Sequence, residues 1–242
     1  MDKWDPLLVN TLAATRPVIL IDYVGVGKSV GKVATSFKDS ADDMIAALIQ
    51  IGVKEVDILG FSIGGFVTQM VALNAPANKL KVRKIVLCGT GASAGPGIKL
   101  SPNNYMPAAT TEKIDLVNFK ELFFAHNPAG EKHAEEWWAR LSERNEATSG
   151  EAPSQWLSWG FTDDGEGLKN QGISIEKFLT AETSQGVEGS YGRLPSFDIP
   201  VLIANGSTVP NGRLLVYPDS GHGFLYQYAE SFGKLVAHFL DE

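Results

Sequence analysis

One serine in this chain stands where a hydroxyl could be made reactive. The run 60–65 (GFSIGG) follows an apolar stretch and precedes a helical pattern. A Gly-x-Ser-x-Gly turn between a strand and a helix strains the backbone at the serine and exposes its hydroxyl. The backbone N–H of Ile63 would then face the negative oxygen that forms when Ser62 attacks a carbonyl carbon. Ser62 is therefore the candidate nucleophile, and Ile63 is the candidate oxyanion-binding residue.

A histidine that could act as the base follows the last apolar run of the chain. His222 lies in the Gly-rich segment Asp219–Phe224, directly after Arg213–Tyr217. Such a loop can place an imidazole at the same sheet edge as Ser62, where it would accept the serine proton. The other histidines, at positions 126, 133 and 238, lie in an insertion or inside the final helical pattern. A purely structural turn histidine is the alternative interpretation of His222.

The elements that must position these residues alternate along the chain. Near-continuous Val, Ile and Leu runs predict strands covered on both faces, as in a parallel sheet. Helical spacing of apolar residues predicts helices between them, so the fold class is α/β. The expected strands are Arg16–Asp22, Glu55–Phe61, Val82–Gly89, Ile199–Asn205 and Arg213–Tyr217, and the expected core helices are Leu7–Ala14, Asp39–Ile51, Gly64–Ala75 and Phe224–Leu240.

A long segment interrupts this alternation. Residues 105–190 are rich in charge, Gly and Ser, and they hold four of the five tryptophans. Helices are expected over Thr111–Phe124 and Lys132–Asn145. We expect residues 1–104 and 191–242 to form the core, and residues 105–190 to form a helical cap packed over one end of the sheet.

Composition excludes several function classes. The chain has 242 residues, a formal net charge of −7 and 44% hydrophobic residues, without a basic stripe. These values indicate a globular protein that does not bind nucleic acid. No apolar run is long enough to span a bilayer, so we expect no membrane association and a cytoplasmic protein. The single cysteine, Cys88, lies in an apolar run and is expected to be buried.

Nucleotide binding through Gly25–Ser29 is the main rival from another class. The Gly-Lys-Ser at its end resembles part of a phosphate-binding loop, but Asp22 stands where the first glycine of such a loop is required. Helical spacing resumes only near Asp39, too far away for a helix N-terminus to meet phosphate. No His, Cys or Asp cluster has metal-ligand spacing. We therefore expect neither a cofactor nor a metal, and a small molecule as the substrate.

These segments together resemble the α/β-hydrolase superfamily, close to its esterase and cofactor-free haloperoxidase-like branches. The segments that carry the resemblance are RPVILIDYVGVGKS (16–29), VDILGFSIGGFVTQMVAL (56–73), VRKIVLCGT (82–90), IPVLIANGS (199–207) and LLVYPDSGHGFL (214–225). The resemblance implies a mostly parallel sheet flanked by helices, with a helical cap. It also implies Ser62 as nucleophile, His222 as base and Ile63 as one oxyanion donor.

Three features depart from the family pattern. The family has a further strand before Arg16–Asp22, whose loop supplies the second oxyanion N–H; that strand would lie between the strands holding Val18 and Ile58. The family's acid usually follows the strand equivalent to Ile199–Asn205, and residues 206–212 contain no Asp or Glu. Those seven residues are also too few for a helical crossover. Asp219, Asp22, Asp163 and Asp164 are weak substitutes for the acid.

The favoured function is a serine hydrolase that cleaves an ester or related acyl bond of a small, apolar substrate. The alternative is a catalytically impaired or inactive hydrolase-like protein, with a binding role or as a truncated product. The departures predict weak turnover and marginal stability. They also predict that one sheet face near Val201 and Ile203 loses its apolar cover.

Overall fold

The sheet is parallel, as the sequence predicts. The computed structural model describes residues 3–98, 115–147, 165–204 and 212–242. Over these residues four strands lie in the order β1 (Glu55–Phe61), β2 (Lys81–Cys88), β3 (Val201–Ala204) and β4 (Gly212–Leu214). Every neighbouring pair is parallel. The carboxyl ends of these strands therefore meet at one edge, which is where Ser62 and the β2–β3 connections emerge.

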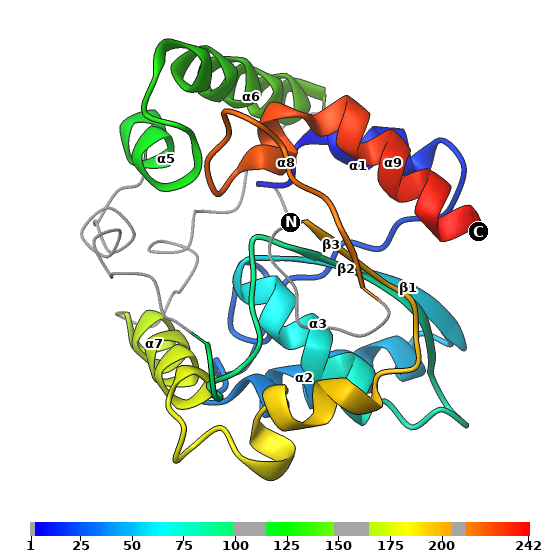
Figure 1. Cartoon of the computed structure of the whole chain (residues 1–242). Coiled ribbons are helices and arrows are strands. Elements are labelled where there is room, and N and C mark those ends of the chain that lie inside the picture. Colours follow the sequence, from blue (N-terminus) through cyan, green and yellow to red (C-terminus); the bar gives the residue numbers. More distant parts are fainter. Residues whose placement is uncertain (1–2, 99–114, 148–164, 205–211) are drawn as a thin grey trace.

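Helices cover both faces of the sheet (Figure 1). Successive residues of β2 point to opposite faces: Val86 and Cys88 join one hydrophobic core, and Ile85 and Leu87 join the other. The first core contains residues of α1 (Pro6–Ala13), α8 (Phe224–Gln227) and α9 (Ala229–Asp241). The second contains residues of α2 (Phe37–Gln50) and α3 (Ile63–Asn74). The predicted core helices are thus confirmed, with the last one broken at Tyr228.

The helices of the predicted cap segment are divided between the two cores. Residues of α5 (Leu116–Phe123) and α6 (Pro128–Ala147) belong to the first core, through Phe119 and Trp137. Phe178 of α7 (Glu166–Leu179) belongs to the second, beside α2 (Figure 1). Short 3₁₀ turns follow at Gly186–Glu188 and Tyr191–Ser196. The division into a core and a separate cap stays a prediction.

The predicted strand Arg16–Asp22 is wrong. This segment has no strand assignment, and no backbone hydrogen bond joins it to β1 among the described residues. Val18 and Ile19 are 36% and 49% exposed, whereas a strand covered on both faces would bury them. Strand formation needs a hydrogen-bonding neighbour as well as β propensity. No strand lies between this segment and β1 among the described residues, so the segment has no described neighbour with which to pair.

The predicted loss of apolar cover at β3 is also wrong. Val201 is 0% exposed and Ile203 is 4% exposed. Leu194 and Phe197, from the 3₁₀ turn that precedes β3 and the residue after it, belong to the same core cluster as these two side chains. This 3₁₀ turn therefore helps to cover the apolar side chains of β3. From the sequence we expected that only a helix after β3 could cover them. The predicted last strand is confirmed in part, because β4 ends at Leu214 and not at Tyr217.

A buried ion pair ties the start of the chain to α6. The Asp5 side chain is fully buried and accepts a hydrogen bond of 2.8 Å from the backbone N–H of Leu7, which caps α1. Arg140 of α6 donates to both carboxylate oxygens of Asp5, through Nε at 3.1 and 3.2 Å and through Nη2 at 2.6 Å. The same Nη2 donates to the carbonyl of Tyr226 at 3.0 Å. One guanidinium therefore links α1, α6 and α8.

Candidate active site

Ser62 sits at the sharp turn from β1 into α3. Its backbone has φ 55° and ψ −121°, a conformation that favours glycine. The Ser62 N–H donates to the carbonyl of Cys88 on β2 at 2.9 Å, and the Ser62 carbonyl accepts from Gly65 N–H at 2.9 Å. These two bonds hold the strained residue on both sides. The side chain is half-buried at the carboxyl edge of the sheet.

The glycines around Ser62 are needed for different reasons. A Cβ on Gly60 would lie 2.3 Å from the carbonyl oxygen of Gly64, and a Cβ on Gly65 would lie 2.3 Å from the Thr90 side chain. Neither position can hold a larger residue without displacing its neighbours. A Cβ on Gly64 would meet only the Tyr23 hydroxyl, at 3.5 Å. The sequence pattern treats the three glycines alike, whereas in the structure only the first and the last are crowded.

His222 is brought to the same edge of the sheet by a closely packed loop. Its ring lies 4.9 Å from the ring of Phe61, which directly precedes Ser62, and 5.8 Å from that of Phe123. A Cβ on Gly89, the residue after β2, would lie 2.8 Å from the imidazole Cε1. The N–H of Gly223 donates to the Phe123 carbonyl, which anchors the histidine loop to the end of α5. The two aromatic neighbours were not anticipated from the sequence, although Phe61 directly precedes Ser62.

Burial lowers the pKa of His222 below its ordinary value. His222 is exposed as a whole residue, but two aromatic rings and the Gly89 backbone pack against its imidazole. Partial loss of water disfavours the charged imidazolium. His222 is therefore expected to be neutral near pH 7, which is the form that can accept a proton.

The described residues do not join Ser62 and His222 by a hydrogen bond, and they supply no acid to His222. The two side chains are placed at one edge but not linked. Asp219 has φ 47° and is exposed, and only its backbone carbonyl takes part in a hydrogen bond, from Gln227. The Asp22 carboxylate lies beside Gly27 in its own turn. Asp163 and Asp164 fall outside the described residues.

The remaining candidates from the sequence lie elsewhere. His126, His133 and His238 are on helices or their ends, each beside a glutamate. Gly25–Ser29 itself contains turns, and the next helix begins only at Phe37, so no helix N-terminus meets this loop. Cys88 is buried, and burial raises the pKa of its thiol. Within the described ranges no group of three or more His, Cys, Asp or Glu side chains could hold a metal ion.

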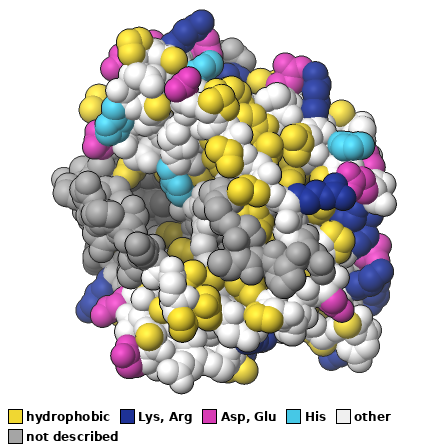
Figure 2. Space-filling model, in the orientation of Figure 1, with side chains coloured by type: hydrophobic (Ala, Val, Ile, Leu, Met, Phe, Trp, Pro, Cys, Tyr) yellow, Lys and Arg dark blue, Asp and Glu magenta, His cyan; other side chains and the backbone are white. Residues whose placement is uncertain are grey.

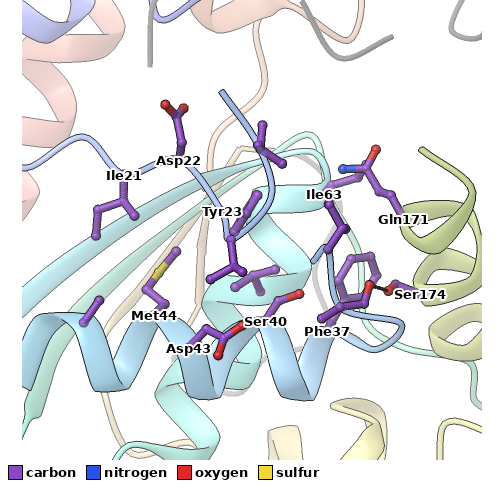
Figure 3. A pocket seen from close by; sticks show the side chains of 16 residues that line it. Ile21, Asp22, Tyr23, Phe37, Ser40, Asp43, Met44, Ile63, Gln171 and Ser174 are labelled. Carbon is purple, nitrogen blue, oxygen red and sulfur yellow. Dashed lines mark hydrogen bonds between the residues drawn. The ribbon is translucent and has the colours of Figure 1, made fainter. Parts of the chain in front are cut away.

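The shape of the molecule leaves room near this edge. Figure 2 shows a histidine side chain and many hydrophobic side chains on the face that is drawn. A pocket lies next to the start of α3, lined by residues that include Tyr23, Phe37, Met44, Ile63 and Gln171 (Figure 3). It encloses about 60 Å³ and its lining is mostly apolar. No helix in the described parts of the chain combines the length and apolarity needed to cross a membrane.

Comparison with known proteins decides the family. The family model described as "alpha/beta hydrolase fold" matches residues 1–155. The chain belongs to the alpha/beta hydrolase fold family. The predicted superfamily is thereby confirmed, while the narrower esterase and haloperoxidase-like branches stay predictions.

Individual alpha/beta hydrolases give further comparisons. The chain is 34% identical to a putative carbamate hydrolase RutD of Azorhizobium caulinodans, over 38% of the chain and 33% of that protein's length. It is 25% identical to a 2-hydroxy-6-oxononadienedioate/2-hydroxy-6-oxononatrienedioate hydrolase of Cupriavidus pinatubonensis, over 95% of the chain and 78% of the relative. Among solved structures, an alpha/beta hydrolase fold protein from Chitinophaga pinensis superposes with a TM-score of 0.80 at 25% identity, covering 100% of this chain and 85% of that one.

Proposed function

We propose that this alpha/beta hydrolase cleaves an ester or related acyl bond with Ser62 as nucleophile and His222 as base. The observation that carries the proposal is the strained turn at Ser62, which lies between a strand and a helix and adjoins the edge where His222 lies. A small-molecule substrate, the cap role of residues 105–190 and a cytoplasmic location belong to the same proposal.

The proposed reaction has two halves. The Ser62 oxygen attacks the carbonyl carbon while His222 takes the hydroxyl proton, and the carbonyl electron pair moves to oxygen. The backbone N–H of Ile63 stabilises this oxyanion. The intermediate collapses, the bond to the leaving group breaks, and His222 returns the proton to the leaving oxygen. Water then attacks the acyl-serine with His222 again as base, which releases the acid and restores Ser62.

The surroundings of Ser62 suggest an apolar substrate. Phe61 and Phe123 flank the histidine, and the pocket beside Ile63 has a mostly apolar lining. The two curated relatives are named for the hydrolysis of a carbamate and of an unsaturated dicarboxylate. Neither name identifies the substrate of this chain. An uncharged ester with a short acyl group is therefore the first substrate to test.

Reaction with a fluorophosphonate probe tests the nucleophile. The probe phosphonylates a serine only where a base and an oxyanion site activate its hydroxyl, so wild-type protein is expected to be labelled and Ser62→Ala is expected to lose the label entirely. Mass spectrometry of the intact protein and its peptides measures the outcome. Ser231→Ala is the matched control, because this exposed hydroxyl donates to the Tyr228 carbonyl and has no part in the proposed reaction. Equal labelling of wild type and Ser62→Ala would refute Ser62 as nucleophile.

The pH profile tests the base. Only neutral His222 can accept the serine proton, and burial lowers its pKa from 6.5. Activity is therefore expected to persist as the pH falls through 6.5 and to be lost only at lower pH, when the imidazole gains its proton. The measurement is kcat/KM for a neutral ester from mildly alkaline to acid pH. A midpoint above 6.5 would contradict the described surroundings of His222.

A hydrolase-like binding protein is the second candidate. It is favoured by the missing hydrogen bond between Ser62 and His222 and by the missing acid among the described residues. Loss of the acid alone can cost about 10⁴-fold in kcat. This candidate predicts that small apolar esters bind with measurable affinity but that no turnover depends on Ser62, which calorimetry together with an esterase assay distinguishes from slow catalysis.

A further inference from the structure

The proposed reaction has one identified oxyanion donor where two are usual. Ile63 N–H is the first donor, and none of the described residues forms the strand and loop that supply the second donor in this family. Removing one donor from such a site typically costs about 10²- to 10³-fold in rate. A hydroxyl or amide placed beside Ile63 from another element would restore much of that loss, so the surroundings of the α3 N-terminus are where a substitute belongs.

Tyr23 is placed beside this N-terminus. Its hydroxyl lies 3.5 Å from the position that a Cβ on Gly64 would occupy, two residues after Ser62. Tyr23 and Ile63 line the same pocket, Tyr23 from the segment before α2 and Ile63 from the first turn of α3 (Figure 3). The Gly65 N–H is already bonded to the Ser62 carbonyl, and no other backbone group bonds the N–H of Ile63 or Gly64 among the described residues.

The Tyr23 hydroxyl is free to donate. It makes no hydrogen bond to any described residue, and it is not among the fully enclosed polar atoms that lack a partner, so its oxygen keeps some accessible surface. Burial raises the pKa of Tyr23 above its ordinary value, which keeps the phenol protonated near neutral pH. A phenolic O–H of this kind can donate to an oxyanion without first giving up another bond.

The backbone holds Tyr23 in place. Its carbonyl accepts a hydrogen bond of 3.0 Å from Val26 N–H, which closes a tight turn. Gly25 within this turn has φ 76°, and a Cβ there would lie 2.8 Å from the Val33 nitrogen, so glycine is required. The Tyr23 ring also packs against the second hydrophobic core. A donor fixed in this way needs little rearrangement during the reaction.

We propose that the Tyr23 hydroxyl is the second oxyanion donor of this site, acting with Ile63 N–H on the oxygen that develops when Ser62 attacks. The proposal rests on the proposed serine-hydrolase function. It makes Tyr23 a catalytic residue, since the hydroxyl would touch the reacting oxygen. In this proposal the second donor is a side chain that approaches from the segment before α2.

Tyr23→Phe tests this proposal, because it removes one oxygen that has no hydrogen-bond partner in the described part of the chain. Turnover of p-nitrophenyl acetate and butyrate is expected to fall by about 10²- to 10³-fold in kcat, with KM nearly unchanged. A trifluoromethyl ketone forms a hemiketal oxyanion with the active serine, so its inhibition constant is expected to rise by at least about tenfold in the variant. Tyr228→Phe is the matched control, since that hydroxyl donates to the Pro218 carbonyl on the surface.

The outcomes separate this inference from the function on which it rests. Equal activity of wild type and Ser62→Ala, including no activity in either, refutes the proposed function. Ser62-dependent turnover that Tyr23→Phe leaves unchanged refutes the oxyanion role alone. A Tyr23→Phe protein that loses its circular dichroism or melts far below the wild type also refutes it, because the hydroxyl would then have a structural partner. Only a folded variant with reduced kcat, weaker ketone inhibition and an unaltered Tyr228→Phe control supports it.

Discussion

His222→Ala is expected to lower the kcat of Ser62-dependent ester hydrolysis by about 10²- to 10⁴-fold, the usual contribution of a general base. Without the imidazole, the Ser62 hydroxyl must lose its proton to water as it attacks. We expect the decrease in kcat to lie at the lower end of that range. No described acid orients the imidazole, so the wild-type site has no complete catalytic triad among the described residues. Steady-state kinetics on p-nitrophenyl acetate measure the effect.

Two features make the His222 experiment specific. The variant leaves a space between the rings of Phe61 and Phe123, so added imidazole is expected to restore part of the lost rate. His238→Ala is the matched control, because that side chain is 80% exposed on α9. An unchanged rate in His222→Ala would remove this histidine from the mechanism and leave Ser62 without a base among the described residues.

Arg140→Met is expected to lower the free energy of unfolding by about 3 to 5 kcal/mol. The substitution keeps the length of the side chain but leaves the Asp5 carboxylate, which is fully buried, without its counter-charge. It also removes the hydrogen bond to the Tyr226 carbonyl. Such a loss would be a large share of the about 5 to 15 kcal/mol by which domains are stable. Urea unfolding followed by circular dichroism measures it.

The partner variants identify the cause of this loss. Asp5→Asn combined with Arg140→Met removes the isolated charge yet keeps an N-cap side chain on α1, so the double variant is expected to be more stable than Arg140→Met alone. Asp5→Ala is expected to cost less than Arg140→Met, because the Arg140 side chain is 23% exposed and water can reach it. If Arg140→Met lowered the free energy of unfolding by less than about 1 kcal/mol, the Asp5–Arg140 pair would contribute no more than an exposed surface ion pair. That result would contradict the prediction.

The turn at Ser62 and the loop of His222 could be placed from the sequence because local rules determine them. A glycine pattern between an apolar run and a helical period allows few conformations, and a Gly-rich loop after the last strand ends near the carboxyl edge. The helices were found with ends a few residues from those observed, for example Phe37–Gln50 against the predicted Asp39–Ile51. The spacing of apolar residues and glycines along the sequence is therefore enough to predict the Ser62 turn, the His222 loop and the helices.

The errors have a common origin in contacts that are distant in sequence. Arg16–Asp22 has the composition of a buried strand, but whether it forms one depends on a neighbouring strand, and none of the described strands lies beside it. Cover for Val201 and Ile203 comes in part from a short 3₁₀ turn whose role no periodicity reveals. The approach of Tyr23 to Gly64 likewise joins two segments 41 positions apart, so only the folded chain discloses it.

The conformation of Ser62 has a thermodynamic consequence of its own. A non-glycine residue held at φ 55° costs of order 1 to 3 kcal/mol, which the hydrogen bonds to Cys88 and Gly65 must offset. Glycine would adopt the same backbone without that cost, so Ser62→Gly is the substitution at this turn that would make the folded state more stable. The version of this turn with the least backbone strain thus lacks the candidate nucleophile, and stability and reactivity oppose each other at a single side chain.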